Sequence, residues 1–246
     1  MKSEPGWLAG LLVLFVFLMG CIGLTPATLT PDATASFTST VTDAPSQTAT
    51  AAPTFTPSPT ATITSTPEPF GCLKPSEDYT RLSVNNQTLN ARTLGMLAQA
   101  QTLYGGEIEL TGHAVTQGSY TDSLATSFGT HAGGGAVDLS VLRRGTYTVL
   151  WDDIPPLLRV LRAAGFAAWL REYGELHANS PIHIHAIAIG DAELSPAAQA
   201  QLTGEAGYFR GFNGLPIPAG GMPIPDRYGG PIVCQWMIEL GYGDLR

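Results

Sequence analysis

Apolar and polar positions divide this chain into three stretches of different character. Residues 1–20 hold an almost unbroken apolar run, from Trp7 to Met19. Residues 21–69 hold few large apolar side chains and are dominated by Thr, Pro, Ala and Ser. Only residues 70–246 carry apolar positions at the spacings of amphipathic helices and strands, so we expect the folded domain there.

The periodicity within residues 70–246 predicts helices mixed with short strands. The first helix is expected to begin after Asn90, a favourable N-cap residue, and to end at Gly105. Two more helices are expected from Asp152 or Asp153 to Gly165 and from Ser195–Pro196 to Leu202. Strands are expected at residues 107–115, 136–141, 166–170 and 183–189, with loops at 116–130 and 172–181 and an irregular tail. This order favours an α+β fold, a small and mainly antiparallel sheet with flanking helices.

The apolar run near the N-terminus predicts export from the cytosol. Lys2 precedes it, as in a signal peptide. The run ends in Leu18-Met19-Gly20-Cys21, which resembles the lipobox of bacterial lipoproteins, whose Cys is lipidated. An uncleaved membrane anchor is the alternative, since Trp7 to Leu24 is nearly long enough to cross a bilayer. Either interpretation places the domain in the cell envelope, outside the cytoplasm and attached to a membrane, and the first does so through lipid on Cys21.

Residues 21–69 are expected to form a disordered tether. They bury too little apolar surface to offset the entropy of ordering the chain, and repeated Pro keeps them extended. At about 3.1 Å per residue, such a stalk reaches on the order of 100 Å. Its Thr and Ser residues are also candidates for O-linked sugar.

Charge and cysteine content narrow the class of protein further. The net charge of −8 does not indicate a basic patch that would bind nucleic acid. We expect the protein to be a monomer. Of the three Cys residues, Cys21 is assigned to lipid, which leaves Cys72 and Cys234 near the two ends of the domain. A disulfide between them fits an oxidising compartment, and two buried free thiols are the alternative.

Four side chains of the domain are suited to metal chemistry. His131 and Asp138 flank a run of three Gly residues that lets the backbone turn tightly, and Asp138 lies on a predicted strand. His183 and His185 are two apart on another predicted strand, so they share a face. If the two strands are neighbours, three of these side chains can hold one Zn²⁺ and leave a fourth position for water, whose pKa drops toward about 7.

These residues carry a resemblance to a known family. The stretch His131-Ala132-Gly133-Gly134-Gly135-Ala136-Val137-Asp138 fits HxxGxAxD, the signature of M15-type zinc D-Ala-D-Ala peptidases. They share the LAS metallopeptidase fold with murein endopeptidases of the MepA type, and His183-Ile184-His185 resembles the HxH motif of that group. The resemblance covers roughly residues 90–190. It implies zinc held by His131, Asp138 and His185, and a peptidoglycan peptide as substrate.

The departures from the family pattern bear on the reaction. The family loop usually contains an Arg that binds a substrate carboxylate, but here the matching stretch Gln117–Tyr120 has none. The Glu that carboxypeptidases place three residues before the last ligand is Ile182. The MepA-like pattern therefore fits better, with His183 in a catalytic role near the metal. Glu175 or Glu172, on the preceding loop, is the alternative general base, and His183 in place of His185 is the alternative ligand.

Three functions follow from these residues. The first is a membrane-tethered zinc metallopeptidase that hydrolyses peptidoglycan stem peptides or cross-links. The second is a module of the same fold that binds cell-wall peptide without cutting it, which the missing Arg and Glu favour. The third is an envelope lipoprotein in which zinc is structural. Three ligands under an open groove would favour the enzyme, and four protein ligands in a closed site would favour the structural role.

Overall fold

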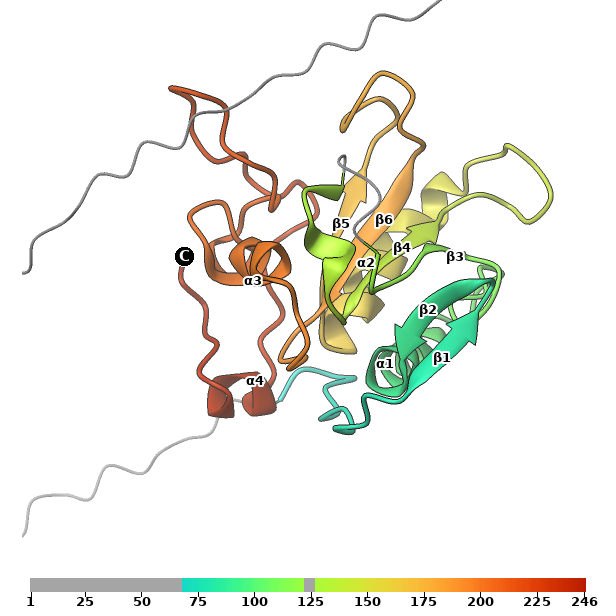
Figure 1. Ribbon diagram of the computed structural model, residues 1–246, viewed down its shortest axis with the longest axis horizontal. Helices are drawn as coiled ribbons and strands as arrows, with labels where there is room; N and C mark the ends of the chain where they lie inside the picture. The colour runs from blue at the N-terminus through green and yellow to red at the C-terminus, as the bar shows by residue number, and fades with distance from the viewer. Residues whose placement is uncertain (1–67, 122–126) are drawn as a thin grey trace, which may run out of the picture. The chain divides into compact units, whose positions relative to one another are not determined.

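The structure, a computed structural model, describes residues 68–121 and 127–246 (Figure 1). The predicted signal peptide at 1–20, the lipidation site Cys21 and nearly all of the tether at 21–69 lie outside the described residues. Within the part that is described, no helix is both long enough and apolar enough to cross a membrane.

A four-stranded sheet forms the centre of the domain. Its strands lie in the order β3 (Val115–Gln117), β4 (Ala136–Ser140), β6 (His183–Ala188) and β5 (Phe166–Arg171), and all neighbours are antiparallel. A separate hairpin pairs β1 (Arg81–Val84) with β2 (Gln87–Asn90). The prediction of an α+β fold with a small antiparallel sheet is confirmed.

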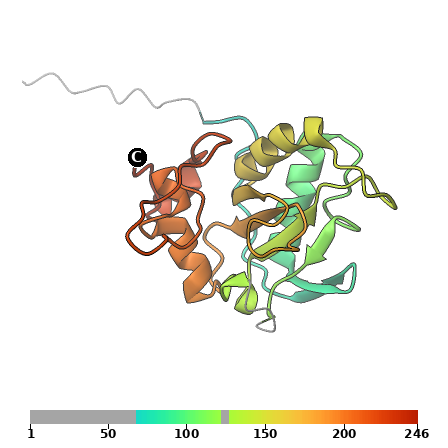
Figure 2. The ribbon, with the colours of Figure 1, turned by 90° about the horizontal axis from the view of Figure 1, so that it is seen from above.

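Helices α1 (Ala91–Tyr104) and α2 (Ile154–Ala163) pack on one face of the sheet (Figures 1 and 2). Helix α1 begins where predicted because the Asn90 side chain accepts a hydrogen bond from the Thr93 amide at 2.8 Å, and it ends at Gly105 in the left-handed conformation. A short 3-10 turn, η3 (Trp151–Asp153), leads into α2. The buried side chains between these helices and the sheet include Leu97, Leu158, Leu161, Leu139, Ile184 and Phe166.

The other face of the sheet is partly covered by the C-terminal segments. These are α3 (Pro196–Thr203), η4 (Tyr208–Arg210) and α4 (Gln235–Glu239). Their buried residues pack against Ala136, Ala167 and Ile187. A disulfide joins Cys72 to Cys234, as predicted, and so links the start of the domain to α4.

Two predictions are wrong: the strand at residues 107–115 and the wholly irregular tail. Residues 107–114 form turns, and only the last predicted residue, Val115, begins a strand. The alternating pattern misled because Ile108 and Leu110 reach the core from a loop, in which Glu109 and His113 face each other at 2.8 Å. The tail contains the short helix α4, which sequence periodicity did not indicate.

Candidate metal centre

A tight backbone turn places His131 beside the strand that carries Asp138. His131 lies in the 3-10 turn η2 (Thr130–Ala132), and the chain enters β4 through three glycines. Gly135 has a φ of 77°, which a residue with a side chain adopts only with strain. A Cβ atom on Gly133 would lie 2.3 Å from the Glu193 carbonyl oxygen, so the backbone there approaches its neighbour too closely for a side chain.

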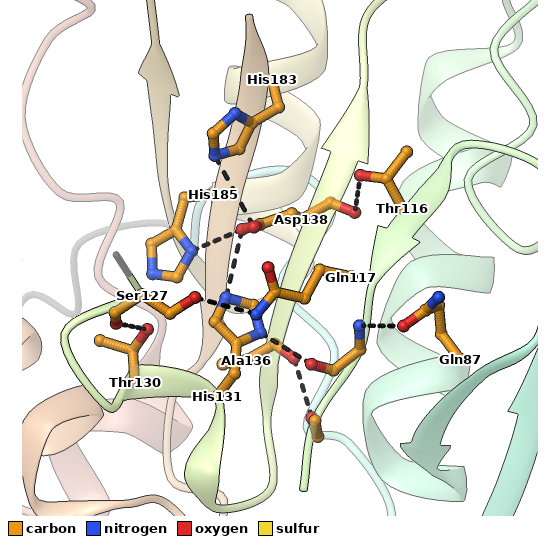
Figure 3. Close-up of polar contacts among 12 residues, drawn as sticks. Gln87, Thr116, Gln117, Ser127, Thr130, His131, Ala136, Asp138, His183 and His185 are labelled. Carbon is orange, nitrogen blue, oxygen red and sulfur yellow. Dashed lines mark hydrogen bonds and ion pairs between the residues drawn. The ribbon is translucent and has the colours of Figure 1, made fainter. Parts of the chain in front are cut away.

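The register of the sheet brings the remaining side chains to the same face. Asp138 lies directly opposite His185 in the β4–β6 ladder, and Gln117 pairs with Asp138 from β3. On the far side of β6, Arg171 lies opposite His183. Because directly opposite residues point to one face of a sheet, these side chains form a polar patch. Figure 3 shows Gln117, Asp138, His183 and His185 of this patch.

Three of the predicted ligands converge on one point. Asp138 Oδ1 lies 2.7 Å from His185 Nδ1 and 3.3 Å from His131 Nε2. The three ligand atoms all lie within 4.8 Å of one another, and both imidazoles are buried. In tetrahedral zinc, ligand atoms are about 3.3 Å apart. The group of His131, Asp138 and His185 could therefore hold a metal ion.

The hydrogen bonds around the two imidazoles fit a cation. His131 Nδ1 donates to the Gly118 carbonyl at 2.7 Å, and its other nitrogen faces Asp138. His185 likewise has Asp138 at Nδ1 and the side-chain oxygen of Gln201 at Nε2, the latter at 3.1 Å. A neutral imidazole has one N–H, so each ring faces one acceptor more than it can serve. A cation next to Asp138 would take the place of the missing proton at each ring. The hydrogen bonds to the Gly118 carbonyl and to the Gln201 side chain orient the two rings toward such a cation.

The electrostatics of the group keep the carboxylate ionised. Burial alone would raise the pKa of Asp138, but the hydrogen bonds from His131 and His185 hold it well below its usual range. Burial would lower the pKa of His131, and the Asp138 carboxylate together with the Gly118 carbonyl raises it instead. For His185 burial prevails over Asp138 and lowers the pKa to about 4. At neutral pH the group thus contains an anionic carboxylate and a neutral His185, both of which are metal-binding forms.

His183 lies beside the group of three rather than within it. Its Nδ1 donates to the Pro181 carbonyl at 2.7 Å, and its Nε2 lies 3.7 Å from Asp138 Oδ2 (Figure 3). The geometry therefore matches His185 as the ligand better than the alternative with His183. The Nε2 atom of His183 points toward the Asp138 carboxylate from a position two residues before His185 on β6.

The four residues of the candidate site line an open cavity of about 270 Å³. Sequence reasoning missed two of its buried members, Arg171 at the end of β5 and Gln201 on α3. Neither residue belongs to a sequence motif: Arg171 reaches the cavity through the pairing of β5 with β6, and Gln201 through the packing of α3. The cavity is lined by Thr116, Gln117, Ser127, Phe128, Thr130, His131, Asp138, Arg171, Leu176, His177, Ser180, Pro181, His183, His185, Gln201 and Leu215.

The two candidate general bases on the loop after β5 lie outside this lining. Glu175 is exposed, and its carboxylate accepts a hydrogen bond from the Glu172 amide at 2.7 Å. The Glu172 carboxylate forms an ion pair with Arg227 at 2.8 Å. The structure thus brings together His131, Asp138, His183 and His185, and it does not bring either Glu to them.

Comparison with known proteins adds no relative to this picture: no protein-family model, curated protein or solved structure matches the chain. The candidate metal centre therefore rests on its own geometry. Two imidazoles and a carboxylate suit zinc, copper, iron or nickel better than calcium or magnesium. Three protein ligands beside an open cavity would leave one coordination position of a tetrahedral ion to water.

Proposed function

We propose that this chain is a zinc metallopeptidase, tethered to a membrane in the cell envelope, that hydrolyses peptide bonds in peptidoglycan. The observation that carries the proposal is the group of His131, Asp138 and His185 beneath an open cavity. Zinc is the metal because it favours imidazole and carboxylate ligands and leaves one position to water in hydrolytic enzymes.

The peptide substrate follows from the resemblance to M15 and MepA-type peptidases. HxxGxAxD places His131 and Asp138 at the two ends of one motif, and HxH supplies His183 and His185. In this structure His131, Asp138 and His185 converge on one point, and His183 Nε2 lies beside them, 3.7 Å from Asp138 Oδ2. This agreement between motif and geometry supports a peptidase over an unrelated metal site.

The residues of the chain divide the chemistry between them. A bound zinc ion would polarise the scissile carbonyl and lower the pKa of a coordinated water. His183 keeps its proton on Nδ1, where the Pro181 carbonyl accepts it, so Nε2 is free to take up the proton that water loses and to return it to the leaving amine. Protonated His183 also stabilises negative charge that develops on the carbonyl oxygen. Glu175 remains the alternative base, and it would have to leave its hydrogen bond to Glu172.

The location is part of the proposal. A lipid on Cys21 and a stalk at 21–69 would hold the domain outside the cytoplasm, in reach of the cell wall. The disulfide between Cys72 and Cys234 supports an oxidising compartment, where such bonds persist.

A binding module is the second candidate function. The absence of an Arg from Gln117–Tyr120 and the presence of Ile182 where carboxypeptidases have Glu both favour it. Such a module would hold cell-wall peptide in the same cavity and leave it uncut.

Mass spectrometry of peptidoglycan incubated with the full chain separates the two functions. The enzyme releases fragments with zinc and none with chelator, and His131→Ala abolishes release. His113→Ala is the matched control, because His113 lies on a turn outside the cavity lining. Retention on peptidoglycan without any fragment would refute the hydrolase and favour the binding module.

A further inference from the structure

We propose that Arg171 binds a carboxylate of the substrate, so that the substrate carries a free carboxylate within about two residues of the bond that is cut. This inference deepens the proposed function and takes from it that the substrate is a peptide whose bond to be cut lies at the metal centre. It names the chemical group that the cavity selects.

Arg171 is buried with part of its guanidinium unused. The residue is 2% exposed and lines the cavity. Its Nη1 donates to the Asn213 carbonyl at 2.9 Å, whereas Nη2 has no hydrogen-bond partner among the described residues. An uncompensated guanidinium N–H inside a protein is costly, so this nitrogen is suited to an acceptor that a ligand supplies.

The position of Arg171 in the sheet sets its distance from the metal centre. Arg171 pairs with His183 across β5 and β6, while Trp169 pairs with His185. Arg171 is therefore the diagonal neighbour of His185, at about 7–8 Å between Cα atoms. An extended peptide advances about 3.4 Å per residue. A peptide with its scissile bond at the metal centre thus brings a group one or two residues away to the guanidinium.

The charge of Arg171 suits an anion rather than a neutral polar group. Burial lowers the pKa of its guanidinium to about 10, against the opposing influence of Glu175, Asp138 and Asp226, so the group stays protonated at neutral pH. None of the three carboxylates forms a hydrogen bond to it among the described residues. Guanidinium binds carboxylate with charge-assisted hydrogen bonds, and Lys does not reproduce their planar geometry.

The test uses the full chain and peptidoglycan stem-peptide fragments, either untreated or with their carboxylates converted to carboxamides. Binding to the metal-free protein is measured by isothermal titration calorimetry, and cleavage of both fragment sets is measured with zinc. Arg171→Gln removes the cation and Arg171→Lys keeps the charge without the planar fork. Arg227→Gln is the matched control, because Arg227 is exposed and lies outside the cavity lining.

We expect the metal-free wild type to bind the untreated fragments about 10- to 100-fold more tightly than the amidated ones. Arg171→Gln should remove this preference, Arg171→Lys should restore part of it, and Arg227→Gln should keep it whole. The preference is a ratio within each variant, so partial loss of folded protein does not mimic its loss. Equal or undetectable binding of both fragment sets to the wild type, or an unchanged preference in Arg171→Gln, would overturn the inference.

The two proposals fail separately in this experiment. A preference that depends on Arg171 without any cleavage would support the carboxylate site and refute the hydrolase. Cleavage of both fragment sets at equal rates would support the hydrolase and refute the carboxylate site.

Discussion

Replacing Gln201 with Met is expected to weaken metal binding about 10- to 100-fold without unfolding the domain. The Nδ1 atom of His185 faces Asp138, so this nitrogen is the one available to a metal. The proton of the ring must then sit on Nε2, where the side-chain oxygen of Gln201 accepts it at 3.1 Å. Met has a similar volume to Gln and no acceptor of comparable strength.

The magnitude follows from what the substitution leaves behind. Gln201 is 8% exposed, so little water is available to replace its oxygen. A buried N–H without a partner costs about 1–3 kcal/mol. A loss of 10- to 100-fold in metal affinity corresponds to about 1.4–2.7 kcal/mol, which lies in the same interval. Gln201→Glu keeps an acceptor and is expected to retain most of the affinity.

Competition titration against a zinc-binding dye measures the affinity of each variant. Gln199→Met is the matched control, since Gln199 belongs to the same helix, is only partly buried and lies outside the cavity lining. Circular dichroism verifies that all variants are folded. An affinity of Gln201→Met within twofold of the wild type would refute the assignment of Nδ1 as the ligand atom of His185.

Three further predictions concern the metal-free domain. The pKa of His185, lowered to about 4 by burial, means that its unfolded form gains a proton near pH 6.5 and its folded form does not. Its contribution to stability is therefore full above about pH 6.5 and is lost as the pH falls toward 4; a His185 titration near 6.5 by NMR would contradict this. Gly133→Ala places a Cβ atom 2.3 Å from a backbone oxygen and should cost roughly 1–3 kcal/mol in urea unfolding, whereas Gly95→Ala meets nothing within 4 Å and should not destabilise. Double replacement of Cys72 and Cys234 by Ala opens a loop of 162 residues and should lower the unfolding free energy by roughly 4–5 kcal/mol; a loss below 1 kcal/mol would show that the disulfide contributes little.

Local signals made much of the fold predictable. The ends of α1 follow from an N-cap side chain and a left-handed glycine, which act within a few residues of the chain. The strand expected at 107–115 failed because its alternating pattern has another cause. Ile108 and Leu110 fill the core from a loop, and burial alone does not distinguish a loop from a strand.

The candidate site was predictable where its residues belong to motifs. His131, Asp138 and His185 follow from short spacings, combined with the expectation that their strands pair. Arg171 and Gln201 have no such motif. Arg171 reaches the cavity only because β5 pairs with β6, and Gln201 only because α3 packs over the ladder, and both are tertiary arrangements.

Elemental analysis of the purified protein tests the metal centre most directly. We expect one zinc ion per wild-type chain, retained in His113→Ala and lost in Asp138→Ala, because Asp138 touches both other ligands. A wild type that binds no divalent ion when zinc is supplied, or an Asp138→Ala variant that keeps a full equivalent, would contradict it.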